Sequence, residues 1–441
     1  MIIGLLRHSM NTWVTNERAK SCTEKRRNSR LRGGAMRWLV LGFLVAVYVF
    51  ETVVAILNQK HSRKPIPKNV IGVYDKKRYN KWLAYSLEGH RFNLIQQGFS
   101  LIVLFILLLG PFAILARWVS TWFTHAILQS LIFLGIYQTF MVCLGIPFGL
   151  YRTFSIEERY GFNRTTKTIF IRDAVVSYVV TLAVGGLLLG GIHALSLRFV
   201  DNLWMFAFVT WAILAVIMVL TVAFIGKWLM RLFNKFTPLP EGELRTRIEE
   251  LGSALGFNVK AIFVMDASKR STKSNAAFAG IGKTREVILF DTLLERMSDD
   301  EILAVLAHEL GHAVHKDTWR LLARQIAVMA LYAVGIGLIL QTPGFFTAFG
   351  FPGVHFGFGF ILFSILLEPI SLLLGIPLNM LSRQDEYNAD AFASEQTDAR
   401  WMISALKALS RENLVNLNPH PLSVRLYYSH PPMSDRIGAL L

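Results

Sequence analysis

The sequence predicts a mostly α-helical membrane protein with seven transmembrane helices and an α+β polar domain built from two separate stretches. Of the 441 residues, 53% are hydrophobic, and the mean hydropathy of +0.42 is too high for an ordinary soluble protein. Several apolar runs are long enough to cross a bilayer as helices. Two polar stretches, one between the fifth and sixth apolar runs and one after the seventh, contain clustered histidines and carboxylates.

Seven apolar runs predict the membrane spans. They lie at about 38–57, 94–117, 125–150, 173–195, 202–226, 322–342 and 354–378. The expected parts are five membrane helices in 36–230, a first polar half at 231–321, two helices in 322–378 and a second polar half at 379–441. Residues 1–35 are strongly basic and lack the apolar core of a secretory signal. We expect them to be a disordered extension or to precede the true start at Met36.

The formal net charge of +16 does not indicate a nucleic-acid partner, because the basic residues gather in particular loops. Loops 58–93 and 151–172 carry many of them, whereas the turn at 343–353 carries none. This alternation follows the positive-inside rule, which places both loops, the two polar halves and the C-terminus in the cytoplasm. The two cysteines, Cys22 and Cys143, give no indication of a disulfide, as suits a reducing compartment.

The stretch His308-Glu-Leu-Gly-His312 points to a metal site. Side chains four residues apart share one face of a helix, so both imidazoles can bind one Zn²⁺ while Glu309 reaches a water beside it. The preceding residues predict the helix itself, because Ser298 is a good N-cap and Glu301 completes a capping box. The alternative is a chance match, which a second motif downstream disfavours.

A catalytic zinc uses three protein ligands and keeps a fourth position open, so one more ligand is needed. No third histidine follows His312 at the short spacing that metzincins use. Glu386 and Asp390 are four residues apart, so on a helix they point the same way. Glu386 can bind the metal while Asp390 holds the free ring nitrogen of a zinc-bound histidine. Taken alone, these carboxylates also fit an ordinary solvated acidic helix face.

A closed structural zinc site is the alternative. Such sites are four-coordinate and rich in cysteine, but Cys22 and Cys143 lie far from His308 in the sequence. His315 is the nearest candidate for a fourth ligand, three residues beyond His312, and is equally well interpreted as a surface residue. The residues therefore favour an open, catalytic site.

With both motifs in place, the chain resembles the type I CAAX prenyl endopeptidases, membrane-integrated zinc metalloproteases of the gluzincin type. The likeness runs from about residue 38 to the end. Further stretches that carry it are 146–148 with 153–163, 233–239, 268–271, 274–276, 287–293, and 428–432 with Arg436. The departures are the basic extension and a short turn between the sixth and seventh spans.

The resemblance implies a seven-helix membrane barrel that encloses a water-filled chamber, with one Zn²⁺ per chain facing inward. The implied zinc ligands are His308, His312 and Glu386. The implied catalytic residues are Glu309 as general base, Asp390 as the partner of a ligand, and His430 and Arg436 near the reacting carbonyl. The implied substrate-binding residues are Ser274, Asn275, Ala276, Ala277 and Phe278, in an edge strand that pairs with substrate backbone.

The resemblance also implies a zinc endopeptidase that cleaves CAAX-type, prenylated proteins or peptides near the C-terminus, and we expect a monomer. Since no retrieval signal ends the chain at Leu441, both a bacterial inner membrane and the endoplasmic-reticulum membrane stay open. A quality-control membrane protease of the heat-shock type shares the zinc motifs but usually has fewer spans. A transporter or scaffold with structural zinc is disfavoured because a fourth ligand is lacking.

Glu51 in the first span and Glu368 in the seventh are polar residues within apolar runs. Such residues are functional candidates by default. They either line a wet chamber or tie helices together, and the sequence favours neither alternative.

Overall fold

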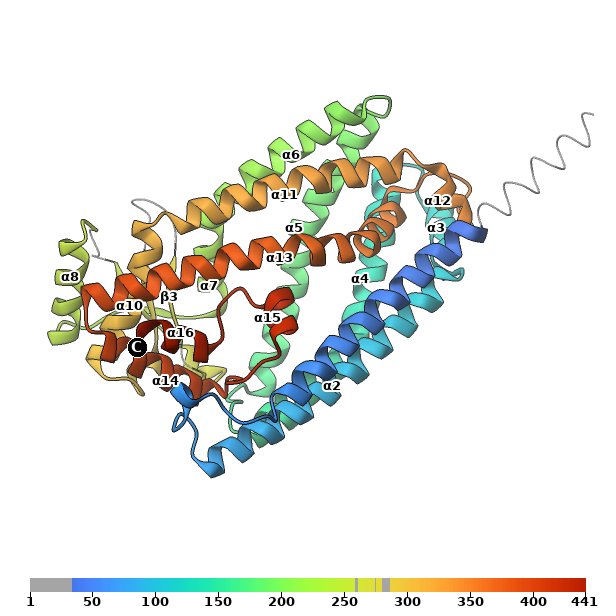
Figure 1. Cartoon of the computed structure of the whole chain (residues 1–441). Coiled ribbons are helices and arrows are strands. Elements are labelled where there is room, and N and C mark those ends of the chain that lie inside the picture. The colour runs from blue at the N-terminus through green and yellow to red at the C-terminus, as the bar shows by residue number, and fades with distance from the viewer. Residues whose placement is uncertain (1–33, 258–260, 274, 280–285) are drawn as a thin grey trace, which may run out of the picture.

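The structure is a computed structural model, and it describes residues 34–257, 261–273, 275–279 and 286–441. The prediction for the basic extension therefore falls almost wholly outside the described residues, and the predicted substrate-binding residue Ser274 lies outside them too. Long helices make up most of the molecule, and a smaller part with a sheet lies at the end that holds the C-terminus (Figure 1).

Seven helices of the described chain are long and apolar enough to cross a membrane, which confirms the predicted number. The first is Gly34–His61. The others are α2 (Lys76–Leu108), α4 (Ala126–Tyr151) continued by the π-helical turn η2 (Arg152–Glu157), α5 (Lys167–Arg198), α6 (Leu203–Leu220) continued by η3 (Thr221–Ile225) and α7 (Gly226–Phe233), α11 (Asp317–Leu340), and α13 (Phe356–Gln396). The chain is a multi-pass membrane protein.

Five of these helices form a closed ring. α4 packs on α5, α5 on α6, α6 on α11, α11 on α13, and α13 returns to α4. Three helices of the ring, α4, α5 and α13, line a largely apolar cavity of about 730 Å³ together with the first helix and α2. Glu368 of α13 is one of the residues that line this cavity. The predicted arrangement of membrane helices around a chamber is confirmed.

The second membrane helix lies earlier in the chain than the predicted span at 94–117. α2 starts at Lys76, where Asp75 caps it by accepting a hydrogen bond from the backbone N–H of Arg78 at 2.6 Å. Pro111 has no N–H to continue a helix, so a separate helix, α3 (Pro111–Trp122), begins there. The apolar run of the sequence therefore belongs to two helices.

The seventh membrane helix does not end near residue 378. α13 runs for 41 residues and continues through Pro369 and Pro377. At 1.5 Å per residue it is about 60 Å long, roughly twice the hydrocarbon thickness of a bilayer. Its last turns therefore extend out of the membrane region, and they carry Glu386 and Asp390.

The polar part is built on a small four-stranded sheet of order β1-β2-β4-β3. The strands are β1 (Phe236–Pro238), β2 (Ile262–Met265), β3 (Ala276–Ala279) and β4 (Glu286–Phe290). β1 pairs antiparallel with β2, β2 parallel with β4, and β3 antiparallel with β4. β3 is thus an edge strand of the sheet in the described chain.

Helix α10 (Asp299–Val314) lies at the centre of the polar part. One side, with Ile302 and Leu306, packs against the sheet, and the other, with Ala304 and Ala307, packs in a second cluster with Trp82 of α2. The remaining helices are η1 (Lys68–Val70), α8 (Glu243–Ala254), η4 (Ala267–Lys269), α9 (Asp291–Leu294), α12 (Pro343–Ala348), α14 (Ala399–Asn413), α15 (Pro421–Tyr427) and α16 (Met433–Leu440).

The loop after the first helix lies against the second polar half. The Tyr74 hydroxyl donates to the carbonyl of Val415 at 2.8 Å, and Asn69 donates to the carbonyl of Ser434 at 2.5 Å. Loop 151–172 contacts the first polar half, where Arg164 N–H donates to Arg270 O at 3.1 Å. Both basic loops and both polar halves therefore gather at one end of the helix ring.

Candidate active site

The metal motif sits on α10, as the sequence predicts. Ser298 caps the helix and forms the expected capping box with Glu301. The turns that follow place His308 and His312 on one face, and their Nε2 atoms lie 3.2 Å apart.

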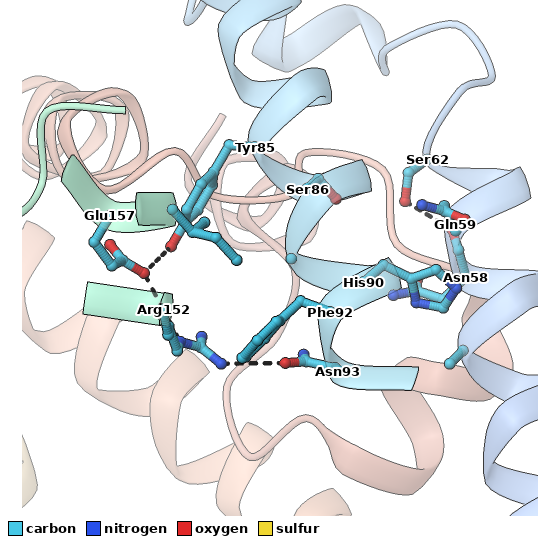
Figure 2. Close-up of a pocket in the computed structure, with 13 residues that line it drawn as sticks. Asn58, Gln59, Ser62, Tyr85, Ser86, His90, Phe92, Asn93, Arg152 and Glu157 are labelled. Carbon is cyan, nitrogen blue, oxygen red and sulfur yellow. Dashed lines mark hydrogen bonds and ion pairs between the residues drawn. The ribbon is translucent and has the colours of Figure 1, made fainter. Parts of the chain in front are cut away.

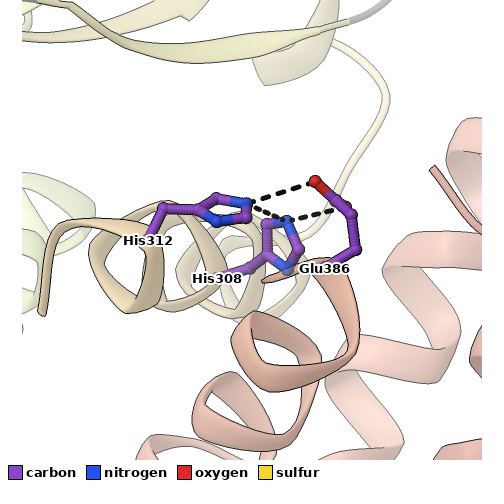
Figure 3. Close-up of side chains that lie close together, drawn as sticks. All are labelled: His308, His312 and Glu386. Carbon is purple, nitrogen blue, oxygen red and sulfur yellow. Dashed lines mark hydrogen bonds and ion pairs between the residues drawn. The ribbon is translucent and has the colours of Figure 1, made fainter. Parts of the chain in front are cut away.

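The extended α13 brings Glu386 to the same point (Figure 3). Its Oε1 lies 3.3 Å from His312 Nε2, and its Oε2 lies 3.5 Å from His308 Nε2. Two ligands bound at 2.0–2.1 Å in tetrahedral geometry are about 3.3 Å apart, so the three separations fit one tetrahedral ion. These residues form the group of three side chains that could hold a metal ion among the described residues.

The opposite ring nitrogens have carboxylate partners. His308 Nδ1 lies 2.9 Å from Asp390 Oδ1, and His312 Nδ1 lies 2.9 Å from Asp317 Oδ2. A proton on each Nδ1 leaves a lone pair on each Nε2. Two such lone pairs repel at this separation unless a cation lies between them, so the donor set fits a metal ion.

Asp390 is held in turn by Arg436. The guanidinium donates from Nε to Oδ2 at 2.7 Å and from Nη2 to Oδ1 at 2.6 Å, a paired geometry that is favourable for carboxylates. Arg436 is buried and its Nη1 lies 3.4 Å from Glu386 Oε2. The expected place of Arg436 near the reacting carbonyl stays a prediction, and its contacts here are with Asp390 and Glu386.

Asp317 and the charges around it belong to this site although no sequence motif predicted them. Arg320 forms ion pairs with Asp317 and with Asp385, the latter at 2.8 Å, and Arg324 contacts Asp385 at 2.9 Å. Asp317 opens α11 directly after Lys316, whose left-handed backbone (φ 59°) reverses the chain. One sequence signal could have indicated the contact of Asp317 with His312. It is the carboxylate at the first position of the helix that follows the histidine motif.

A cavity of about 320 Å³ opens onto the metal-ligating group. Glu309, His312 and Glu386 line it together with His430, which is exposed and places Nδ1 2.9 Å from Glu386 Oε2. Glu309 is therefore close to the ligands without belonging to the ligand group. The cavity offers room for a peptide bond beside a base and an imidazole.

Burial raises the pKa of Glu309, although the neighbouring His308 and His312 oppose the shift. A raised pKa suits a carboxylate that accepts a proton near neutral pH. Burial would lower the pKa of His312, but its hydrogen bonds to Glu386 and Asp317 raise it to about 9 in the metal-free site. The pKa of His308 is also raised, because hydrogen bonds to Asp390 and Glu386 outweigh burial.

The predicted substrate strand lies next to the metal helix. β3 contacts α10, and its backbone pairs Ala276 with Leu289, Ala277 with Ile288 and Phe278 with Val287 of β4. Asn275 is exposed and directly precedes the strand. The other edge of β3 has no strand partner in the part of the chain that the structure describes.

His315, the candidate for a fourth ligand of a closed site, is not in the ligand group. Its ring packs edge-on against Phe392, with ring centroids 5.6 Å apart. The arrangement of three ligands beside a cavity agrees with an open site.

A closed ring of membrane helices with two histidines and a glutamate beside an edge strand defines a membrane-embedded metallopeptidase. Two family models together match nearly all of the described chain. One, described as CAAX prenyl protease N-terminal, five membrane helices, matches residues 55–235, and the other, peptidase family M48, matches residues 238–441.

Similar proteins point the same way. The CAAX prenyl protease 1 homolog of Arabidopsis thaliana is 34% identical over 91% of this chain and 96% of its own length. The CAAX prenyl protease 1 of Saccharomyces cerevisiae is 31% identical, covering 91% and 94%. The crystal structure of Ste24p from S. mikatae superposes with a TM-score of 0.87 at 29% identity, covering 92% of this chain and 99% of that one.

The chain belongs to the CAAX prenyl protease 1 family of M48 peptidases and is a metalloendopeptidase of the membrane. The peptidase match sets aside the transporter or scaffold alternative. The match of the membrane helices to the CAAX prenyl protease N-terminal region disfavours the heat-shock type.

Proposed function

We propose that the protein is a zinc-dependent endopeptidase that cleaves CAAX-type, prenylated proteins or peptides near the C-terminus. The observation that carries the proposal is the trio His308, His312 and Glu386, whose ligand atoms all lie within 4.8 Å of one another beside a cavity and an edge strand. The names of the relatives supply the substrate class.

The metal in this proposal is a single Zn²⁺. Two imidazoles and one carboxylate, with Nδ1 partners on both histidines, are typical of catalytic zinc sites. When bound, zinc polarises the scissile carbonyl and acidifies a water.

The protein's own residues then carry the proton and the charge. Glu309 takes a proton from the attacking water and passes it to the leaving amine. His430, exposed at the cavity, donates to the oxygen that becomes negative in the transition state. Asp390 and Asp317 fix the rings of the two ligand histidines, and Arg436 fixes Asp390.

The substrate in this proposal lies extended along β3, with Asn275, Ala276, Ala277 and Phe278 as the contacting backbone. The unpaired edge and the contact between β3 and α10 support this placement. The prenyl chain is held by the apolar cavity between the first helix, α2, α4, α5 and α13, or by the bilayer.

The proposed topology places the polar halves, loops 58–93 and 151–172 and the C-terminus in the cytoplasm. The positive-inside pattern supports it, and so does the gathering of both loops and both halves at one end of the ring. The membrane is that of the endoplasmic reticulum or a bacterial inner membrane, and the protein acts as a monomer with no nucleic-acid partner. A reporter fused after Leu441 that proved extracytoplasmic would contradict this arrangement.

The decisive experiment compares a farnesylated CAAX peptide with the same peptide unprenylated, using purified protein in lipid. We expect cleavage of the prenylated peptide, its loss on chelation and its return with zinc. A His308→Ala/His312→Ala variant should contain no zinc, and undiminished zinc in it would refute the ligand assignment. If only the unprenylated peptide is cut, the chemistry stands and the CAAX assignment fails.

A further inference from the structure

A second cavity, of about 250 Å³, lies away from the metal ligands, between the end of the first helix, α2 and η2 (Figure 2). Its lining is mostly polar and includes Gln59, Tyr85, Asn93, Arg152 and Glu157. Amides, hydroxyls and a guanidinium do not suit a prenyl group. They suit a small, polar and hydrogen-bonding part of a ligand.

The cavity lining holds one cation, Arg152, and one anion, Glu157, and a second cation, Lys273, lies beside it. Arg152 donates to Asn93 Oδ1 at 3.1 Å, and its Nε is 4.0 Å from Glu157 Oε1. Glu157 also accepts a hydrogen bond from the Tyr85 hydroxyl at 2.8 Å and lies 3.6 Å from Lys273 Nζ. One carboxylate thus faces two cations, so an anionic ligand would complete the balance.

The cavity also contains a donor without an acceptor in the described part of the chain. Nε2 of Gln59 is buried and has no hydrogen-bond partner among the residues that the structure describes. A buried donor without a partner is destabilising, because it has lost its hydrogen bond to water. A ligand that offers an acceptor would remove that cost.

The cavity is joined to the start of the proposed substrate strand. Loop 151–172 runs antiparallel to the segment before β3, where Thr272 N–H donates to Phe162 O at 3.2 Å and Asn163 bridges to Ser271. The next residue, Lys273, donates from Nζ to the Tyr85 hydroxyl at 3.3 Å. The wall of the cavity and the approach to β3 are therefore one connected structure.

The direction of the substrate follows from strand pairing. Antiparallel pairing is slightly more stable than parallel pairing. Because β3 runs from Ala276 to Ala279, a peptide antiparallel to it points its C-terminus past Asn275 toward Lys273. The three substrate residues that follow the cleaved bond in a CAAX sequence span about 10 Å when extended, at roughly 3.3 Å per residue.

We propose that this cavity is the site that binds the free α-carboxylate of the substrate, with Arg152 and Gln59 as its hydrogen-bond donors. Lys273 contributes positive charge where the peptide leaves β3. The inference rests on the proposed peptidase function and adds to it a recognition site for the substrate's C-terminal end.

The test uses two prenylated peptides that differ only in a C-terminal carboxylate or carboxamide. The measured quantity is the ratio of kcat/KM for the acid to that for the amide, in each variant. Hydrogen bonds to charged groups predict a ratio of about ten to a hundred for the wild type. The Arg152→Gln variant should bring the ratio close to one, and Arg152→Lys should retain part of the preference.

The matched control is Arg159→Gln. Arg159 belongs to the same loop but pairs with Glu88, so its loss changes the net charge equally without touching the cavity. Its ratio should equal that of the wild type. Because each ratio is taken within one variant, partial misfolding cancels. If Arg152→Gln does not accumulate, Gln59→Met provides a second test and should also lower the ratio.

A wild-type ratio of one would overturn the carboxylate site while leaving the peptidase function intact. An unchanged ratio in both Arg152→Gln and Gln59→Met would overturn the assignment of this cavity. A wild type that cleaves neither peptide would contradict the proposed function, and the carboxylate site would fall with it.

Discussion

Arg383 of α13 donates a hydrogen bond from Nη1 to the backbone carbonyl of Tyr428 at 2.7 Å, two residues before His430. The same nitrogen donates to the carbonyl of Val424 at 3.1 Å. Other contacts of this helix face with the C-terminal segment join Asn379 to Leu426, Glu386 to His430 and Asp390 to Arg436. Asn379, Arg383, Glu386 and Asp390 follow one another at intervals of four, three and four residues. This spacing keeps their side chains on one face of α13. The helix that supplies Glu386 thus also positions His430.

Arg383→Gln should lower kcat by about tenfold to a hundredfold while zinc content stays unchanged, because small misplacements of a catalytic group have effects of this size. The loss should be mostly absent in a His430→Ala background, where there is no imidazole left to position. Arg425→Gln is the matched control, since Arg425 lies on the exposed side of α15. Additive losses in the double variant would show that Arg383 does not act through His430.

Glu309→Gln should lower kcat by about 10²–10⁴, the usual contribution of general acid–base catalysis. The variant should bind zinc as the wild type does, because Glu309 is outside the ligand group. Metal analysis and turnover of a farnesylated peptide measure the two effects separately. Wild-type turnover in this variant would mean that another group takes the proton.

Asp317→Asn should weaken zinc binding by about tenfold to a hundredfold, the range found when the partner of a ligand histidine is removed. Asp317 holds Nδ1 of His312 at 2.9 Å, and the amide keeps its shape without its charge. Competition with a chelator measures the affinity. An affinity equal to that of the wild type would mean that Asp317 does not support zinc binding and contributes only its ion pair with Arg320.

Short sequence patterns predict those features of the site that depend on the geometry of a single helix. The i, i+4 spacing of His308 and His312, the capping box at Ser298 and the shared face of Glu386 and Asp390 are all present. These relationships lie within one helix, and helix periodicity determines them. The meeting of the two helices at one metal site was expected from chemistry and from the family resemblance.

Relationships between separate elements could not be read from the sequence. The ion pair of Arg436 with Asp390 joins residues 46 apart, and the contact of Asp317 with His312 depends on the reversed backbone at Lys316. The length of α13 was underestimated because hydropathy locates the membrane, not the end of a helix. Contacts between separate elements depend on tertiary packing, and they produce no periodic pattern of residues in the sequence.

Gly337→Ala should destabilise the helix ring, by about 1–3 kcal/mol as for other overpacked cores. A Cβ at Gly337 of α11 would clash with Leu203 Cδ1 and lie 3.1 Å from Phe206 Cδ1 of α6. Gly191→Ala in α5 is the control, since beyond its own helix backbone no atom of the described residues lies within 4 Å of its Cβ position. Thermal unfolding in detergent should show a lower midpoint for the first variant only, and equal midpoints would mean that α6 and α11 adjust without cost.

Zinc uptake should release protons and strengthen as the pH rises from 7 to 9. Both ligand histidines have raised pKa values in the metal-free site, that of His312 about 9, because Glu386 and the Nδ1 partners favour the protonated rings. A group with a raised pKa holds its proton below that pKa, and a metal must displace it, so each displaced proton raises apparent affinity about tenfold per pH unit over this window. Calorimetry in two buffers of different ionisation enthalpy measures the protons released.

We expect at least one proton per zinc at pH 7 and fewer at pH 9. In Asp317→Asn the number at pH 7 should be smaller, because His312 loses one of the carboxylates that raise its pKa. The direction of the pKa shift fixes whether zinc affinity rises with pH. If the histidine pKa values were lowered instead, zinc binding above pH 7 would release no protons and would not depend on pH. An affinity that stays constant from pH 7 to 9 would therefore show that the histidines are already neutral when zinc arrives.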